Sequence, residues 1–219
     1  ISSLTLSIFF SNSCLSRSAF LERPGSPGYS TKLLNDKAKG DFATNSKIEL
    51  DVHLGTHLDA PLHHIPNGKS IEYLDISKCL GVCAVLDFRG ITRITDQDIR
   101  EKLERSPKLK QNKLLFKTDN SSILTNSPRH FYQEYSALDK SAAQFIANNK
   151  FHLVGIDYYS IQKFEDPADT HEILLDNEIV ILETINLDSI NEGLYFLSCL
   201  PVKFVGLEGS PCRAILTEL

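Results

Sequence analysis

The chain has 219 residues, of which 42% are hydrophobic, and a net charge of -5 at neutral pH. A chain of this length can enclose one sizeable core, so we expect a single domain over residues 1–219. No basic patch with interleaved aromatic residues occurs, which argues against a nucleic-acid partner. No apolar run reaches the 18 residues of a membrane span, so we expect no membrane partner either.

Cysteine usage indicates the compartment. The chain has five cysteines, an odd number, and none of them forms a Cys-x-x-Cys pair. Scattered cysteines of this kind are typical of free thiols in a reducing environment rather than of a disulfide framework. The sequence therefore predicts a cytoplasmic protein.

The first half of the chain is rich in strand signals. Leu4, Leu6 and Ile8 alternate with small polar residues, which predicts a first strand rather than a secretory signal. Residues 48–52 form a further strand that leads into a histidine-rich stretch, and the apolar run at 81–88 reads as a buried strand.

The second half alternates helices with strands. Thr95 is expected to cap a helix that runs to about Leu103, with Asp98 completing a weak capping box. We expect a short strand at 113–117, a loop at 118–126, a helix at 139–149 and a strand at 153–156. Alternating strands and helices over one chain predict the α/β class.

The most informative stretch is 51–64, which contains four of the seven histidines. In an extended strand, side chains alternate between the two faces, so His53, Gly55, His57 and Asp59 would share one face. The glycine would leave room there for an ion, and Pro61 should end the strand because it cannot donate to a central ladder. Imidazole and carboxylate together suit zinc, and also manganese or iron.

Two other interpretations of this stretch remain open on spacing alone. A single histidine in a strand is usually a core or surface residue without a ligand. Several ligand-capable residues on one face could also form a polar sheet face or a hydrogen-bond network instead of a metal site. The regular spacing nevertheless favours the metal site.

The same residues carry a resemblance. The run His53-x-Gly55-Thr56-His57-x-Asp59-x-Pro61-x-His63 resembles the H-x-G-T-H-x-D-x-P-x-H motif of the metal-dependent cyclase family, which includes bacterial kynurenine formamidase and isatin hydrolase. The resemblance implies a swivelling β/β/α single domain, with a central barrel-like mixed sheet flanked by helices. It also implies His53, His57 and Asp59 as metal ligands.

Later segments extend the resemblance to the end of the chain. Residues 154–160 resemble the family's V-G-I-D-x-x-S segment, and residues 206–214 resemble its closing G-S-P-x-R-A pattern. In two-metal members a histidine and a glutamate twelve residues apart complete a second site, and His171 and Glu183 have this spacing. Glu172 and Glu178 are the competing carboxylates.

The resemblance implies an enzyme, a metal-dependent amidohydrolase that acts on non-peptide C–N bonds. The expected reaction is arylformamidase hydrolysis of N-formylkynurenine to kynurenine and formate in tryptophan catabolism, by metal-activated water with His63 as acid and base. His63 suits that role because an unperturbed imidazole titrates near physiological pH. His64 replaces the family's usual phenylalanine, which puts the formamide substrate in question.

Several points stay open at this level. A cyclic amide or lactone of isatin type is the alternative substrate, and a non-catalytic, metal-stabilised binding protein is the alternative class. Zinc is favoured over manganese, with one or two ions. The resemblance also implies a homodimer or higher homo-oligomer, and the substrate-binding residues are unknown.

Overall fold

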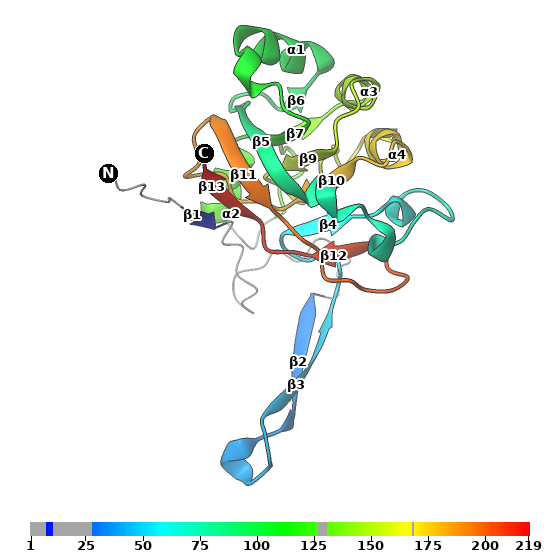
Figure 1. The fold of residues 1–219 in the computed structure, drawn as a ribbon, viewed down its shortest axis with the longest axis vertical. Coiled ribbons are helices and arrows are strands. Elements are labelled where there is room, and N and C mark those ends of the chain that lie inside the picture. The colour runs from blue at the N-terminus through cyan, green and yellow to red at the C-terminus, as the bar shows by residue number, and fades with distance from the viewer. Residues whose placement is uncertain (1–7, 11–27, 127–130, 168) are drawn as a thin grey trace.

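A computed structural model describes residues 8–10, 28–126, 131–167 and 169–219. Nine strands of the described chain form one mixed sheet in the order β1-β13-β11-β5-β7-β9-β10-β4-β12 (Figure 1). The sheet curls, so β4 and β12 run across the direction of β5 and β11 (Figure 1). In sheet order the strands are Ile8–Phe10, Ile215–Glu218, Gly193–Ser198, Leu80–Asp87, Lys113–Lys117, Leu153–Ile156, Val180–Glu183, His57–Asp59 and Gly209–Pro211.

The centre of the sheet is parallel. Strands β5, β7, β9 and β10 pair in parallel, whereas β1, β13 and β11 on one side and β4 and β12 on the other are antiparallel. Parallel strands are covered on both faces, which explains their continuous apolar sequences. This mixed α/β sheet with flanking helices confirms the expected fold class.

Four helices accompany the sheet in the described chain: α1 (Asp96–Arg105), α2 (Asn120–Asn126), α3 (Lys140–Asn148) and α4 (Asp169–Asp176). Three of them, α1, α3 and α4, lie together along one side of the sheet (Figure 1). Their apolar side chains pack on Leu114, Phe116 and Ile156, while Leu115 points into a second core on the opposite face. None of the described helices is long and apolar enough to cross a membrane.

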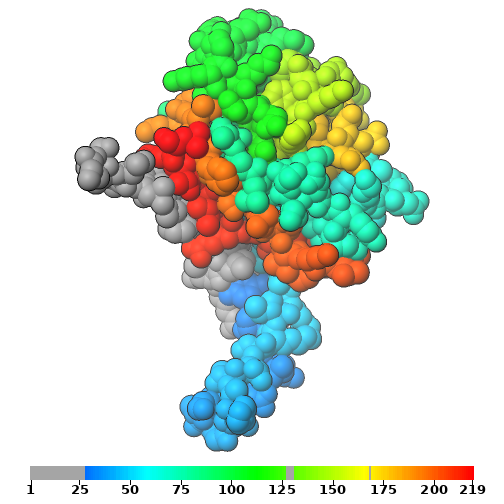
Figure 2. Space-filling model, in the orientation of Figure 1, coloured from blue at the N-terminus to red at the C-terminus, as the bar shows by residue number. Residues whose placement is uncertain are grey.

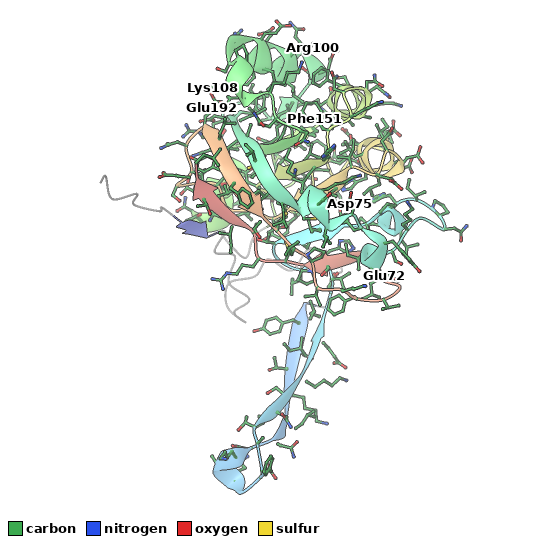
Figure 3. The ribbon with its side chains drawn as sticks, in the orientation of Figure 1. Glu72, Asp75, Arg100, Lys108, Phe151 and Glu192 are labelled. Carbon is green, nitrogen blue, oxygen red and sulfur yellow. The ribbon has the colours of Figure 1, made fainter. Side chains whose placement is uncertain are left out.

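Local capping explains where two of these helices begin. Thr95 and Asp98 form the capping box at the start of α1, and the Asp139 side chain accepts the Ala142 N–H at the start of α3. At the other end of α1, the carboxylate of Glu192 accepts hydrogen bonds from the Asp87 backbone N–H at 2.9 Å and from the Lys102 ammonium in the last turn at 2.8 Å (Figure 3). Because of the two N-terminal caps, α1 and α3 begin at the residues that the sequence indicates.

One sequence-based expectation about the elements is wrong, and another is confirmed only in part. Residues 118–126 were expected as a loop, but α2 occupies Asn120–Asn126. The strand expected at 48–52 is β3 (Asn45–Leu50), which pairs with β2 (Tyr29–Asn35) in a separate two-stranded hairpin. This hairpin projects far from the rest of the molecule (Figures 1 and 2). The strand expected around Leu4 and Leu6 lies largely outside the described residues, of which Ile8–Phe10 form β1.

Candidate metal centre

Strand β4 is the short platform of the site. It lies between β10 and β12, and Glu183 is the direct cross-strand partner of His57. Because side chains alternate along a strand, His57 and Asp59 point to the same face as Glu183, and Leu58 enters the core on the other face. Three ligand-capable side chains thus meet on two neighbouring strands. As expected, the strand ends before Pro61.

The prediction that His53 belongs to the same strand is wrong. His53 lies in the turn before β4, and Gly55 interrupts the extended run with a φ of +69°. That left-handed conformation, which glycine adopts without steric cost, turns the chain back toward β4. His53 still reaches the site, because its Nδ1 lies 2.9 Å from Asp59 Oδ1.

His171 comes from another layer of the fold. It is the third residue of α4, and its Nε2 lies 3.2 Å from Glu183 Oε1 and 3.9 Å from Asp59 Oδ2. The two competing glutamates do not take part. Glu172 is exposed on α4, and Glu178 forms an exposed ion pair with Lys69.

These residues form two groups that share Asp59. Each group places its three ligand atoms within 4.8 Å of one another: His53, His57 and Asp59 in the first, and Asp59, His171 and Glu183 in the second. In the first group Asp59 Oδ1 lies 3.3 Å from His57 Nε2, which in turn lies 3.4 Å from Glu183 Oε2. Ligands about 2 Å from a common ion keep comparable separations from one another.

The residues fit a divalent ion by a second criterion. Among the described residues, His57 Nε2 and both Asp59 oxygens are buried and have no hydrogen-bond partner, although nearly all buried polar atoms in proteins have one. An uncompensated buried carboxylate is costly, and a cation between these atoms would satisfy all of them. The donor set of three imidazoles and two carboxylates suits zinc or manganese.

The protonation of the site matches this fit. Burial opposes the ionised forms of both acids, but the neighbouring imidazoles outweigh it and lower the pKa of Glu183 to about 2 and that of Asp59 well below its usual range. Burial would likewise lower the pKa of His57, yet Asp59 and Glu183 raise it to about 10. Both carboxylates are therefore ionised, which is the form that binds metal ions, whereas His57 carries a proton that it would have to release to bind one.

Strained backbone fixes the position of Glu183. The next residue, Thr184, has a φ of +57°, which is costly for a β-branched residue. It is held there because its carbonyl accepts the Thr56 hydroxyl at 2.7 Å and its N–H donates to the Tyr158 carbonyl at 2.8 Å. The motif residue Thr56 thus connects the histidine turn to the strand that carries Glu183.

Two further histidines lie beside the two groups. His63 ends the short 3-10 helix η2 (Pro61–His63), and His64 follows it. The His63 ring stacks on His53 at 3.9 Å between centroids, and the His64 ring stacks on His171 at 4.4 Å. Burial lowers the pKa of each to about 4, so both imidazoles are neutral at physiological pH, and the expectation that His63 titrates near that pH is wrong.

Sequence reasoning missed three residues of the site. Gln162 Oε1 lies 3.3 Å from His171 Nδ1, and Glu208 Oε1 lies 3.7 Å from His53 Nε2. Gly209 provides the space for His53, since a Cβ there would lie 2.8 Å from the imidazole Cε1. Glu208 and Gly209 lie in the segment that resembles the closing pattern of the family, but nothing in that pattern indicates contact with His53. Gln162 carries no sequence signal.

Fold and site together define an α/β protein with a buried histidine–carboxylate centre for a divalent metal. The family model described as Cyclase, putative cyclase, matches residues 4–163 of this chain. This segment is well over half of the 219 residues. The chain belongs to the cyclase family.

Individual relatives agree with this placement. Cyclase-like protein 3 of Oryza sativa subsp. japonica is 34% identical over 206 residues, which cover 90% of this chain and 74% of that protein. Kynurenine formamidase of Delftia acidovorans is 32% identical over 202 residues, covering 90% of each chain. A solved structure of a potential metal-dependent hydrolase with cyclase activity has a TM-score of 0.81 at 27% identity, and the superposition covers 98% of each chain. These relatives support an enzyme of the metal-dependent hydrolase class.

Isatin hydrolase A of Ralstonia solanacearum shares the fold. Its TM-score is 0.79, with 98% of this chain and 92% of that chain covered, at 18% identity.

Proposed function

We propose that this protein hydrolyses the C–N bond of a small amide, and that the substrate is an aryl formamide such as N-formylkynurenine. The observation that carries the proposal is the pair of buried ligand groups sharing Asp59, with the uncommitted imidazole of His63 stacked beside them. The likeness to the Delftia acidovorans kynurenine formamidase over nine-tenths of both chains supports the formamide substrate.

In this proposal His53, His57 and Asp59 hold one ion, and Asp59, His171 and Glu183 hold a second. Zinc is the favoured metal and manganese the alternative. A bound divalent ion polarises a carbonyl oxygen and lowers the pKa of water, which are the two requirements of amide hydrolysis near neutral pH.

His63 is the proposed acid and base. A neutral imidazole can take the proton of the attacking water and return it to the leaving nitrogen, whose departure as a free amine requires protonation. The stacking of His63 on His53 fixes the ring beside the proposed ligands.

Two alternatives remain. A cyclic amide or lactone of isatin type would use the same groups, and the shared fold of isatin hydrolase A is the observation behind it. A metal-stabilised binding protein without turnover is the second. A structural zinc site usually closes its coordination with four protein ligands, whereas each group here offers three. This open coordination favours the enzyme.

The test is hydrolysis of N-formylkynurenine by protein loaded with zinc or manganese, with a chelated sample as control. We expect metal-dependent formate release, reduced about 100-fold or more in His63→Ala with zinc content unchanged. His152→Ala is the matched control, because His152 is exposed and its ring bonds Asn112 rather than a proposed ligand. Turnover of an isatin-type ring alone would favour the first alternative, and full activity of His63→Ala would refute the assigned role.

We also propose that the protein is a homodimer in which the β2–β3 hairpin of each copy packs against the other copy. A two-stranded hairpin is at best marginally stable alone in water, and here its side chains project away from the strands (Figure 3). Leu33, Leu34 and Ile48 are 50%, 54% and 59% exposed, and Phe42 near the tip is 98% exposed.

A reciprocal exchange would bury these residues against apolar surface of the body. Val202 and Val205, in the loop between β11 and β12, are 53% and 81% exposed. A two-fold arrangement of copies covers both surfaces twice. Light scattering should give twice the chain mass, and Leu34→Asp with Ile48→Asp should give monomer. Gln144→Asp with Asn148→Asp, two exposed positions on α3 in the body, should stay dimeric. A monomeric wild type would refute this arrangement.

A further inference from the structure

Gln162 lies directly behind His171. Its side-chain oxygen Oε1 is 3.3 Å from His171 Nδ1 and also 3.3 Å from the His171 backbone N–H. The backbone N–H belongs to the first turn of α4, where helical donors have no partner within the helix. One amide oxygen thus caps the helix and holds the ring that the helix carries.

The bond to Nδ1 determines what the other ring nitrogen can do. An amide oxygen only accepts, so Nδ1 must carry the proton in the neutral ring. The lone pair of Nε2 would then be available to an ion bound beside Glu183 Oε1 and Asp59 Oδ2, which lie 3.2 and 3.9 Å from Nε2. The opposite tautomer would place a proton on Nε2 and prevent it from binding a metal ion.

The two ligand groups differ in how this tautomer is fixed. In the first group, His57 Nδ1 donates to the backbone carbonyl of Gly55 at 2.8 Å, a partner that no substitution removes. In the second group the partner is a side chain. The tautomer of His171 therefore depends on the identity of residue 162, whereas that of His57 depends only on the course of the turn.

Hydrogen bonds fix both the side chain and the backbone of Gln162. Its Nε2 donates to the Asp166 carbonyl at 3.2 Å, its backbone N–H donates to Ser160 Oγ at 3.2 Å, and its carbonyl accepts the Tyr135 hydroxyl. The residue is 7% exposed. Because Nε2 is committed to Asp166, the amide cannot turn its nitrogen toward His171 without losing a bond. The acceptor is thereby kept on the ring.

We infer that Gln162 is a positioning residue that fixes the Nδ1-protonated tautomer of His171 and so sets the metal affinity of the Asp59, His171 and Glu183 group. This inference rests on the proposed function, because it requires that the group binds a divalent ion. The hydrogen bonds of the Gln162 amide go to His171 and to the Asp166 carbonyl, so we expect it to act through the imidazole.

The test is zinc affinity, measured by competition with a chromogenic chelator, and it needs no substrate. Loss of an outer hydrogen-bond partner typically weakens metal binding 10- to 100-fold. We therefore expect Gln162→Leu to weaken zinc binding at the Asp59, His171 and Glu183 group by about this factor. Gln162→Glu keeps the acceptor and should bind zinc at least within a few-fold of wild type. Gln144→Leu is the matched control, because Gln144 is exposed on α3 and should have no effect.

A double-mutant cycle separates positioning from general damage to the fold. If Gln162 acts through His171, Gln162→Leu should change zinc affinity less than about two-fold in a His171→Ala background. An equal loss in both backgrounds, or a Gln162→Glu variant as weak as Gln162→Leu, would overturn the inference. The wild-type titration distinguishes the two proposals: no zinc binding by wild type removes the proposed function, whereas normal binding by Gln162→Leu removes only this inference.

Discussion

Gly209 shows how one absent side chain shapes the metal centre. It pairs with Asp59 across β12 and β4, and the imidazole of His53 lies over its Cα. A Cβ at this position would lie 2.8 Å from His53 Cε1 and 3.0 Å from the Leu58 carbonyl oxygen. The carbonyl belongs to the ladder and is fixed, so the imidazole would have to move.

We therefore expect Gly209→Ala to displace His53 from Asp59 and to weaken zinc binding about 10-fold, comparable to the loss of an outer ligand partner. Chelator competition measures this change. Gly193→Ala is the control, because its Cβ would meet only Tyr195 at an ordinary 3.6 Å. Unchanged zinc affinity in Gly209→Ala would show that His53 does not need its present position.

Among the secondary-structure elements, α3 shows how a local hydrogen bond determines where a helix begins. Asp139 Oδ1 accepts the Ala142 N–H at 3.0 Å and the Ser141 hydroxyl at 2.6 Å. The helix buries Ala142, Ala143, Phe145 and Ile146 against the sheet, as the sequence predicts. Its start is thus fixed by a local bond and its position by packing.

Asp139→Ala should lower the free energy of unfolding by about 1 kcal/mol, since the helix loses its N-terminal cap. Urea denaturation measures the difference. Asp176 is the opposite case, an exposed acid in the last residue of α4, where negative charge opposes the helix dipole. Asp176→Ala should leave stability unchanged or slightly raised, and an equal loss in both variants would contradict the capping explanation.

At the scale of the whole molecule, Asp157 joins separate parts of the chain. Its carboxylate accepts the Thr118 and Ser121 N–H groups at 2.8 and 3.2 Å and both of their hydroxyls at 2.7 Å. The Ser121 hydroxyl oxygen in turn accepts the Leu187 N–H at 2.9 Å. The end of β9, the start of α2 and the segment after β10 therefore meet at one buried acid.

Burial raises the pKa of Asp157 from 3.8 to about 6, although these hydrogen bonds oppose the shift. The folded protein thus holds a proton that the unfolded chain releases. Its contribution to stability is fully present below pH 3.8 and is lost as the pH rises through about 6. The difference amounts to roughly 3 kcal/mol at most.

Asp157→Asn should remove this part of the pH dependence. We expect the stability of the variant relative to wild type to increase between pH 4 and pH 7, measured by urea unfolding at each pH. Comparing differences between the two proteins cancels the other titrating groups. A constant difference across this range would mean that Asp157 does not titrate there.

Local signals in the sequence are enough to predict several elements. The apolar runs of β5, β7 and β9 and the caps of α1 and α3 lie within the segments that they define. The spacing of His57 and Asp59 likewise places them on one face of a strand, because the period of a strand is two. His53 was placed on that strand wrongly, since the left-handed turn at Gly55 intervenes.

Features that depend on residues far apart in the sequence could be seen only in the tertiary structure. α2 was missed because its start has, besides the local bond from the Asn120 N–H to Thr118 Oγ1, bonds to Asp157, which is 36 and 39 positions from Ser121 and Thr118. The family spacing pointed to His171 and Glu183, but only the packing of α4 against β10 brings their side chains to Asp59. Gln162 contacts His171 for the same reason. Local patterns determine secondary structure, whereas a buried polar centre assembles only when separate elements pack together.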